Sequence, residues 1–582
     1  MSTFPDPDSK NPENLIFQYF ATLATAPEGI ARLRELILQL AVQGNLGTQD
    51  PNDEPVSLLF AKIKKEREKL IKEGRAKPEK SLEPINHDNT SYDIPKEWRL
   101  TKFGDIIQRI SNGYSGTQIK GSSGIPLTRI ETISYGYIDR TRLGIVQEVS
   151  DNDIQYYKLE EGDILFSHIN SDKHLGKTAV FREPDLILHG TNLLLIRLFK
   201  KQISFEYVDL FLKYLRSIGY FISIAQHAIH QSSINQTKVK EIVIAIPPLA
   251  EQHRIVAKVD RLMALCDELE ARQQQERAGC LKLGTASLAG LQNTDSLEEL
   301  AQRWAQVCDA FDLILDCSEN VAVLRQTILQ LAVQGRLVRQ EPGDEPAKKL
   351  VERIRREKER LVKEGKIRVD KVSEPVDGDE TPFTIPEGWL WVRLGSVLIK
   401  VQDGVHNSPV NVANGDFMYV TAKNIKPDGI QLSNVTYISA KEHEECYKRC
   451  NAEFGDVLLI KDGATTGIAT INNLHQPFSM LSSVALLKPP KEIINKYLLY
   501  VLRSPFFYTF LREDMSGCAI TRVTLIKLNR FIIPLPPLAE QHRIVAKVDA
   551  LMALCDELEA RLKERARVQE RLAGAVVKGI VA

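Results

Sequence analysis

The sequence predicts a mixed α/β protein built as a pseudo-twofold internal duplication. Two variable modules are separated by a pair of long antiparallel coiled-coil helices. Three observations support this fold class: a 26-residue string that occurs twice, a heptad pattern inside that string, and short strand-like apolar runs between the copies. The 582-residue chain is long enough for several domains, and its 43% hydrophobic and 26% charged content is ordinary for a globular protein.

The longest repeat is PPLAEQHRIVAKVDRLMALCDELEAR, which begins at Pro247 and recurs from Pro536 with a single change, from Arg261 to Ala550. Apolar residues alternate at spacings of four and three in both copies, which is a heptad seam. The prolines mark a helix start, and the following glutamate suits a first turn. We therefore predict two helices of about 30 residues whose seams serve core packing and allow them to lie antiparallel as a spacer.

A second repeat completes the frame. LRELILQLAVQGNL, which begins at Leu33, returns as LRQTILQLAVQGRL, and the similarity continues through a basic helix to IPKEW and IPEGW. The basic helices, 57–72 and 348–363, should end at Gly74 and Gly365. We expect their charges to form a solvated face. The regions predicted are an N-terminal helical region (1–93), a first module (94–246), a central helical spacer (247–384), a second module (385–535) and a C-terminal helix (536–582).

The two modules are alike in length but share little sequence. Each has many short strand patterns, then an apolar helix and a final apolar strand, which indicates a mixed α/β fold. Two similar modules with different surfaces on a repeated frame suggest one scaffold that presents two recognition faces.

Composition narrows the class of protein. Lys+Arg and Asp+Glu tie at 76 each, so a polyanion-binding surface would need its basic residues gathered on one face. The eight cysteines form no CxxC pair and suggest reduced thiols. We found no long apolar run and no signal-peptide pattern, so we expect a cytoplasmic protein without a membrane span.

The sequence favours a protein without catalysis of its own. It has no Asn/Asp-Pro-Pro-aromatic motif, no GxGxxG, no P-loop and no nucleophile elbow. The stretch HEECYKRC, with His443, Cys446 and Cys450, could be drawn as a metal site, but with no second cysteine pair we expect ordinary surface there.

The order of helical segment, variable module and PPLAEQ helix, repeated twice, resembles the specificity subunit of a type I restriction–modification system. LxxxILxLAVQGxL, IPxxW, GDxL and PPLAEQxxIVxxVD carry the resemblance over essentially the whole chain. It implies two target recognition domains, each reading one half of a split sequence in double-stranded DNA. It also implies that the helices set the gap and dock two methyltransferase (modification) subunits for adenine N6 methylation, with restriction (motor-nuclease) subunits joining for cleavage.

The resemblance implies further that the C-terminal stretch pairs with the N-terminal segment. It implies no cofactor or metal on this chain, with S-adenosylmethionine on the methyltransferase subunit and ATP and Mg on the restriction subunit. The extra helical sequence near 294–323 departs from the family pattern, and its packing is left open.

Loops that follow strands and carry side chains able to reach base edges are the candidate DNA contacts. Basic residues there would mostly grip phosphate. The candidates are Lys120, Arg129, His168, Asn170, Lys173, His174, Lys177, Gln231, Asn235, His406, Asn407, Lys423, Asn424, Lys461, Asp462, Thr465, Thr466 and Arg522. The candidates for spacer packing or partner docking are Glu251, Gln252, Arg254, Val259, Leu262, Leu269, Glu540, Gln541, Arg543, Val548, Leu551 and Leu558.

Two alternatives stay open at this point: a duplicated DNA-binding protein that acts without partners, and a coiled-coil adaptor whose modules bind proteins. The near-identity of the repeats favours two equal docking sites for one type of partner over either alternative.

Overall fold

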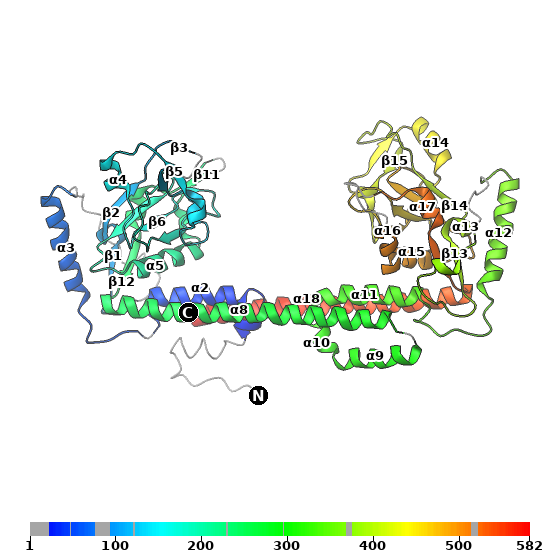
Figure 1. Ribbon diagram of the computed structural model, residues 1–582, viewed down its shortest axis with the longest axis horizontal. Helices are drawn as coiled ribbons and strands as arrows, with labels where there is room; N and C mark the ends of the chain where they lie inside the picture. The colour runs from blue at the N-terminus through cyan, green and yellow to red at the C-terminus, as the bar shows by residue number, and fades with distance from the viewer. Residues whose placement is uncertain are drawn as a thin grey trace. The chain divides into compact units, whose positions relative to one another are not determined.

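The computed structural model describes residues 22–46, 48–75, 94–119, 123–228, 231–294, 296–367, 375–513 and 522–581. The chain divides into two compact units: Met1–Gln274 with Arg565–Ala582, and Gln275–Glu564. Each unit joins a helical frame to one mixed α/β module (Figure 1). The predicted fold class, a mixed α/β duplication, is confirmed.

A four-stranded antiparallel sheet forms the centre of each module, with the same strand order in both: β2-β9-β6-β8 in unit 1 and β14-β22-β19-β20 in unit 2. The middle strands are apolar on both faces because both are covered. In β6, Ile164 and Phe166 join the core shared with the helical frame, and Leu165 joins a separate core on the other face. The strands are β2 Ile107–Asn112, β6 Ile164–Phe166, β8 Thr178–Val180, β9 Leu194–Leu198, β14 Lys400–Asp403, β19 Val457–Ile460, β20 Ala469–Ile471 and β22 Val484–Lys488.

The modules differ in the small sheets beyond this centre. Unit 1 has β3-β5-β4 and β10-β11-β7, whereas unit 2 has β18-β15-β21, with β15 and β21 parallel, and the hairpin β16-β17. These strands are β3 Gln118–Ile119, β4 Ile125–Leu127, β5 Gly144–Val146, β7 Ile169–Asn170, β10 Gln226–Ala228, β11 Gln231–Ser233, β15 Phe417–Val420, β16 Ile425–Lys426, β17 Gly429–Ile430, β18 Thr436–Ile438 and β21 Phe478–Met480.

Helices lie between each central sheet and the frame. In unit 1, α5 contacts β8 and α2, and in unit 2, α15 contacts β20 and α11 (Figure 1). The module helices are α4 Asp151–Tyr157, α5 Phe205–Ser217, α6 Tyr220–Ile224, α7 Gln236–Glu241, α13 Leu394–Val397, α14 Ala440–Arg449, α15 Asn495–Arg503, α16 Pro505–Glu513 and α17 Leu525–Arg530.

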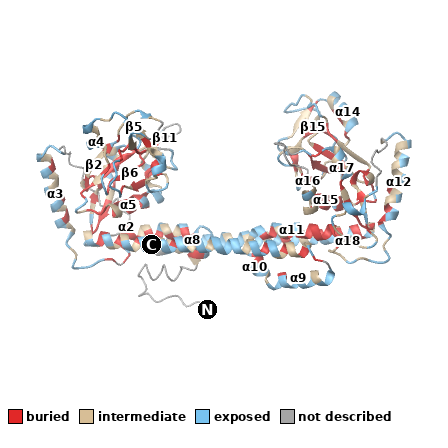
Figure 2. Cartoon of the chain, viewed as in Figure 1, coloured by how far each residue is buried: buried red, intermediate tan, exposed pale blue. Residues whose placement is uncertain are grey.

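The frame helices follow the repeats. They are α2 Gly29–Gln43, α3 Val56–Lys72, α8 Leu249–Gln292, α9 Leu297–Asp309, α10 Phe311–Leu315, α11 Ser318–Val333, α12 Ala347–Lys363 and α18 Leu538–Val581. α8 and α18 have 44 residues each, longer than predicted because no proline interrupts them. The basic helices α3 and α12 are largely exposed (Figure 2). Gly74 and Gly365 follow them with φ of 70°, which confirms both predicted ends.

The frame of unit 1 contains α2, the first part of α8 and the end of α18. Ile255 and Val259 of α8 and Ala573 of α18 belong to the same core as α2, and Arg32 pairs with Glu570 at 3.4 Å. The expected pairing of the C-terminal stretch with the N-terminal segment is therefore confirmed for the described residues.

In unit 2 the first part of α18 packs on α11 through Ile544, Val548 and Cys555. The extra sequence near 294–323 forms α9, α10 and the start of α11, and its Val307 and Ile314 join this core.

A buried Trp–Glu clasp joins module to frame in unit 1. Trp98 donates its indole N–H to Glu251 Oε2 at 2.9 Å, and Thr48 Oγ1 donates to Glu251 Oε1 at 3.0 Å. β1 (Arg99–Lys102), which starts directly after the tryptophan, pairs with β12 (Val243–Ile246), which ends just before the PPLAEQ helix. Both chain connections of the module therefore meet the frame at the clasp.

Unit 2 repeats the arrangement. Trp389 donates to Glu540 Oε2 at 2.8 Å and Gln340 Nε2 donates to Oε1 at 3.0 Å, beside the pair β13 (Leu390–Arg393) and β23 (Ile532–Leu535). Burial raises the pKa of Glu251 and of Glu540. Gly44 and Gly335, which end the AVQG motifs, lie against the proline and tryptophan of IPxxW, so AVQG, IPxxW and PPLAEQ meet at one point in each unit.

For four of the residues predicted for spacer packing or partner docking, the clasp gives the role as packing. Glu251, Gln252, Glu540 and Gln541 are at most 1% exposed, so their side chains hold the chain's own parts together. Gln252 and Gln541 each accept from a backbone N–H of the module, at 2.8 and 2.9 Å. The remaining predicted residues also make internal contacts: Arg254 pairs with Asp53, Arg543 pairs with Asp344, and Val259, Leu262, Leu269, Val548, Leu551 and Leu558 pack in or against the cores.

Candidate nucleic-acid interface

The GDxL motif forms the turn that starts the inner strand of each module. Gly162 and Gly455 adopt φ of 86° and 89°, which favours glycine. Asp163 accepts from Glu160 N at 2.7 Å and Asp456 accepts from Glu453 N at 2.8 Å. These aspartates are buried, so the motif is structural. It fixes the start of the strand and therefore the position of the loop that follows the strand.

In module 1 that loop, 167–177, carries a group of basic side chains. Arg216 of α5 donates to the carbonyl oxygen of Lys173 at 3.1 Å, and Lys177 donates to Ser134 O at 2.7 Å. Burial, followed by the nearby charges of Arg216 and Lys173, lowers the pKa of Lys177. Such a concentration of positive charge suits phosphate. Arg216 was missed from the sequence because it sits on an apolar helix far along the chain.

The two histidines of this loop contribute differently. His168 is buried, and burial lowers its pKa to about 4, so it is neutral at physiological pH. Its predicted place at the DNA surface is corrected, because it lies at the base of the loop, where its carbonyl accepts from Ile234 N at 2.8 Å. His174 is half-buried, and burial and the neighbouring cations lower its pKa.

The β10–β11 hairpin is tied to the same loop. Ser232 Oγ donates to Asp172 Oδ1 at 2.5 Å. Asn170 and Gln231 lie in β7 and β11, but their side chains are outside the described part, as is all of Lys120. Asn235 caps α7 by accepting from Lys238 N at 2.9 Å, a structural use of its side chain.

Arg129 precedes a short 3-10 helix, η3 (Ile130–Ile133), in module 1. Its Nε donates to Gln118 Oε1 at 2.5 Å, and Nη1 lies 3.6 Å from Glu131 Oε1. The guanidinium is partly exposed and is held in place by β3.

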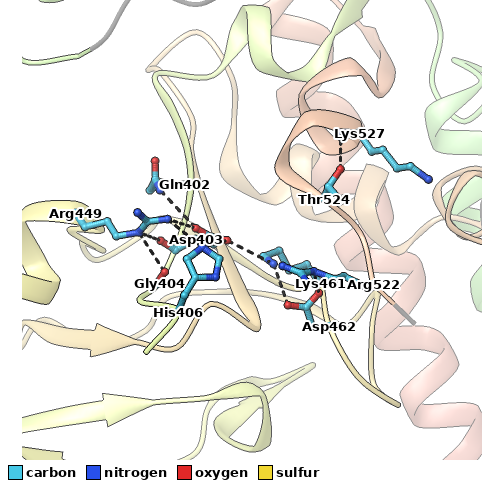
Figure 3. Close-up of polar contacts among 10 residues, drawn as sticks. All are labelled: Gln402, Asp403, Gly404, His406, Arg449, Lys461, Asp462, Arg522, Thr524 and Lys527. Carbon is cyan, nitrogen blue, oxygen red and sulfur yellow. Dashed lines mark hydrogen bonds and ion pairs between the residues drawn. The ribbon is translucent and has the colours of Figure 1, made fainter. Parts of the chain in front are cut away.

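In module 2 the structure brings four predicted residues, His406, Lys461, Asp462 and Arg522, into one charged network (Figure 3). Lys461 Nζ lies 2.9 Å from Asp462 Oδ2 and 3.4 Å from Asp403 Oδ2. Arg522 Nε lies 3.4 Å from Asp462 Oδ1, and His406 Nε2 lies 3.6 Å from Asp403 Oδ2.

The network has a buried centre and exposed edges. The Lys461 side chain is 2% exposed, which corrects its prediction as a DNA contact, whereas that of Arg522 is 60% exposed. Arg449 donates to Asp403 Oδ1 at 2.8 Å from the end of α14. Asp403 and Arg449 were both missed, and only the position of Asp403 directly after a strand pattern could have indicated it. The exposed guanidinium groups can still donate to phosphate or guanine.

The other module 2 candidates divide between surface and interior. Asn407, Lys423 and Thr465 are exposed, and Thr466 Oγ1 donates to Gly463 O at 2.7 Å. Asn424 is buried and caps the 3-10 helix η6 (Ala422–Asn424), accepting from Thr421 N at 3.0 Å, so its prediction as a base contact is corrected.

The HEECYKRC stretch was expected to be ordinary surface, and this is correct for Glu444, Glu445, Lys448 and Arg449 but not for the three candidate ligands. His443, Cys446 and Cys450 are buried, and the histidine ring stacks on Phe417 at 3.8 Å and contacts Ser479 Oγ at 2.9 Å. Across the described ranges, no group of three or more His, Cys, Asp or Glu residues is arranged to hold a metal ion.

The geometry is that of one sheet and one clasp used twice, with different polar loops at the two modules. A family model described as the type I restriction modification DNA specificity domain matches residues 95–277 and 386–567. The chain belongs to this family.

Two full-length relatives are similarly named. The chain is 32% identical to the Type I restriction enzyme EcoAI specificity subunit of Escherichia coli over 95% of this chain and 94% of that protein. It is 30% identical to the EcoEI specificity subunit of the same species, covering 94% and 93%. A shorter match, 46% identical over 28% of this chain and 39% of the relative, is to the putative MjaX specificity subunit of Methanocaldococcus jannaschii.

A solved structure of the HsdS subunit from Thermoanaerobacter tengcongensis is also similar, with 19% identity, a TM-score of 0.40 and coverage of 84% of this chain and 98% of that one. In the part of this specificity-family chain that the structure describes, every helix is too short or too polar to cross a membrane.

Proposed function

We propose that this chain is the DNA-reading subunit of a type I restriction–modification complex, in which each module reads one half of a bipartite target. One observation carries the proposal: the strand order and the Trp–Glu clasp are the same in both units, while the loops that leave the sheets differ. A common frame with different loops is what we expect of a protein that binds one DNA duplex at two different sequences. The full-length similarity to named specificity subunits supports it.

The charged side chains divide between two tasks in this proposal. The cations around the 167–177 loop of module 1 would grip phosphate and fix register. The exposed guanidinium groups of Arg449 and Arg522 in module 2, each held on one side by a carboxylate, would face base edges. A fork that is already oriented loses less conformational entropy on binding.

We propose further that the helical frame docks two methyltransferase subunits and that restriction subunits complete the complex in the cytoplasm. An apolar groove of about 780 Å³ between α9, α11 and α18 supports docking in unit 2, since its Trp304 and Leu554 are 44% and 61% exposed. The occupant proposed is an amphipathic helix of the methyltransferase subunit. This chain would supply no catalysis; S-adenosylmethionine would belong to the methyltransferase subunit, and ATP and Mg to the restriction subunit.

Co-expression tests the proposal. The chain and its methyltransferase subunit would be expressed together and separately in a host without methylation, and N6-methyladenine mapped across the genome. We expect a split motif with a fixed gap only when both are present. Replacing 94–246 by the module of a relative should change one half-motif and spare the other. Methylation of the same sites by the partner alone would refute the specificity role.

A further inference from the structure

A loop of module 1, in which only Arg129 was predicted from the sequence as a DNA contact, displays two exposed tyrosines. Tyr135 and Tyr137 are each 60% exposed, and their rings stack with centroids 6.0 Å apart. Arg142 lies 4.9 Å from the centre of the Tyr135 ring and donates to its hydroxyl at 2.8 Å. We call residues 129–142 the tyrosine loop. Its exposed face combines aromatic rings with a guanidinium, the side chains that bind nucleic acid by stacking and by charge.

Hydrogen bonds brace the loop beneath this face. The buried Thr132 Oγ1 accepts from Arg129 N at 2.8 Å and donates to Arg142 O at 3.0 Å, so the two ends of the loop are joined. Gly136, between the two tyrosines, adopts φ of 81° and allows the tight turn. Exposed rings on a braced loop lose little entropy when they bind.

Module 2 has the same pair of hydrogen bonds joining the ends of its loop, but the loop carries different side chains. Asn424, which corresponds to Thr132, accepts from Thr421 N at 3.0 Å and donates to Gln431 O at 3.2 Å. The residues between Asn424 and Gln431 form the short β16–β17 hairpin, and none of them is aromatic. The brace therefore belongs to the shared scaffold, whereas the tyrosines belong to what distinguishes module 1.

The difference between the two loops indicates which kind of ligand the tyrosine pair contacts. A protein that binds both units in the same way would need the same surface on both modules. The tyrosine pair occurs in one module, next to the loop that Lys177 joins to it by donating to Ser134 O at 2.7 Å. The two half-sites of a split DNA target differ from each other, so a half-site is the ligand that fits a surface present in one module.

We infer that the Tyr135–Tyr137 pair, with Arg142, is a DNA contact of module 1, with the aromatic rings against the sugars and base edges in a groove of its half-site. This rests on the proposed function and adds to it a contact that gives module 1 part of its specificity. The cations of the 167–177 loop supply phosphate contacts, and the tyrosines supply the part that depends on sequence and shape.

The test compares Tyr135→Ala/Tyr137→Ala with Tyr156→Ala in the complex with the methyltransferase subunit. Tyr156 is a matched control, since it is 52% exposed in the same module and also lies under a guanidinium, Arg109, at 3.8 Å. Binding is measured on duplexes that carry the mapped target intact, mutated in the half-site of module 1, or mutated in the other half-site.

We expect the double alanine variant to bind the intact target about tenfold or more weakly and to lose discrimination at the first half-site only. Tyr135→Phe/Tyr137→Phe, which keeps the rings, and Tyr156→Ala should both behave as wild type. Unchanged binding and discrimination in the double alanine variant would overturn the inference. So would loss of the methyltransferase subunit with DNA reading intact, which would indicate a protein contact. A wild-type complex that methylates no split motif would instead refute the proposed function itself.

Discussion

At the scale of single residues, the two clasps differ in one partner. Glu251 accepts from Thr48, whose hydroxyl can donate or accept, whereas Glu540 accepts from Gln340 Nε2, which only donates. A flip of the Gln340 side-chain amide is disfavoured, because Nε2 also donates to Gly335 O at 2.7 Å and would lose that hydrogen bond. The atom that donates to the Glu251 or Glu540 carboxylate, a hydroxyl oxygen in unit 1 and an amide nitrogen in unit 2, therefore decides which substitutions each clasp tolerates.

We expect Glu251→Gln to leave unit 1 nearly as stable as wild type, and Glu540→Gln to destabilise unit 2 by about 1–3 kcal/mol. In unit 2 the nitrogen of the new side-chain amide must face either Gln340 Nε2 or the indole nitrogen of Trp389. Both of these are donors, so neither can accept its hydrogen. Hydrogen exchange, followed separately in the two units, measures this. Equal effects in both units would contradict the assignment of donors and acceptors.

Buried histidines should make module 1 sensitive to acid, and His189 is one of two in its described part, with His168, whose pKa burial lowers to about 4. Burial lowers the pKa of His189 to about 4, well below its ordinary value of 6.5. Between these values the unfolded chain binds a proton that the folded chain does not, so the free energy of unfolding falls as the pH falls from about 6.5 to about 4. His189 O accepts from Tyr114 N at 2.8 Å, and at the corresponding place in module 2 Met480 O accepts from Val405 N at 2.9 Å.

His189→Met should therefore reduce the acid lability of module 1 and leave its stability at pH 7.5 within about 1.5 kcal/mol of wild type. Urea unfolding followed by hydrogen exchange at several pH values checks this. The same pH dependence in the variant would show that other groups are responsible.

At the scale of elements, one carboxylate holds three of them together in module 2. Asp403, at the end of β14, contacts Lys461 after β19 and Arg449 at the end of α14. Since Lys461 is buried, the two carboxylates beside it, Asp403 and Asp462, offset the hydration that its side chain loses.

We expect Asp403→Asn to destabilise unit 2 by about 1–3 kcal/mol, since Lys461 keeps Asp462 as a partner, and to weaken discrimination at the half-site of module 2 alone. Glu444→Gln is the control, because its pair with Lys448 is on the surface of α14, with side chains 70% and 72% exposed, and should change stability by less than about 1 kcal/mol. Thermal unfolding and methylation of half-site variants measure the two effects. A loss of discrimination at both half-sites would contradict a local role.

At the scale of the whole molecule, helix length should set the gap between half-sites. Inserting four residues into α8 adds about 6 Å of rise, roughly one to two base pairs of DNA. Mapping N6-methyladenine after the insertion should show both half-motifs unchanged and the gap lengthened. A changed half-motif with the same gap would mean that the helix takes part in reading.

Much of the frame could be predicted because it depends on short-range patterns. Heptad spacing, the prolines before Leu249 and Leu538, and Gly74 and Gly365 act within a few residues of themselves, so helices and their ends follow from local sequence. The duplication was equally visible, since it is a property of the string itself.

Only the tertiary structure decided which polar residues meet. Glu251 reads as a first-turn glutamate in the sequence, yet it forms the clasp with Trp98 from another part of the chain. Lys461 and Asn424 were predicted as surface residues, but packing buries both, and it leaves Arg449, which shares Asp403 with Lys461, exposed. Periodicity reports which face of an element is buried, whereas a site depends on contacts between loops of distant segments, and no local pattern records those.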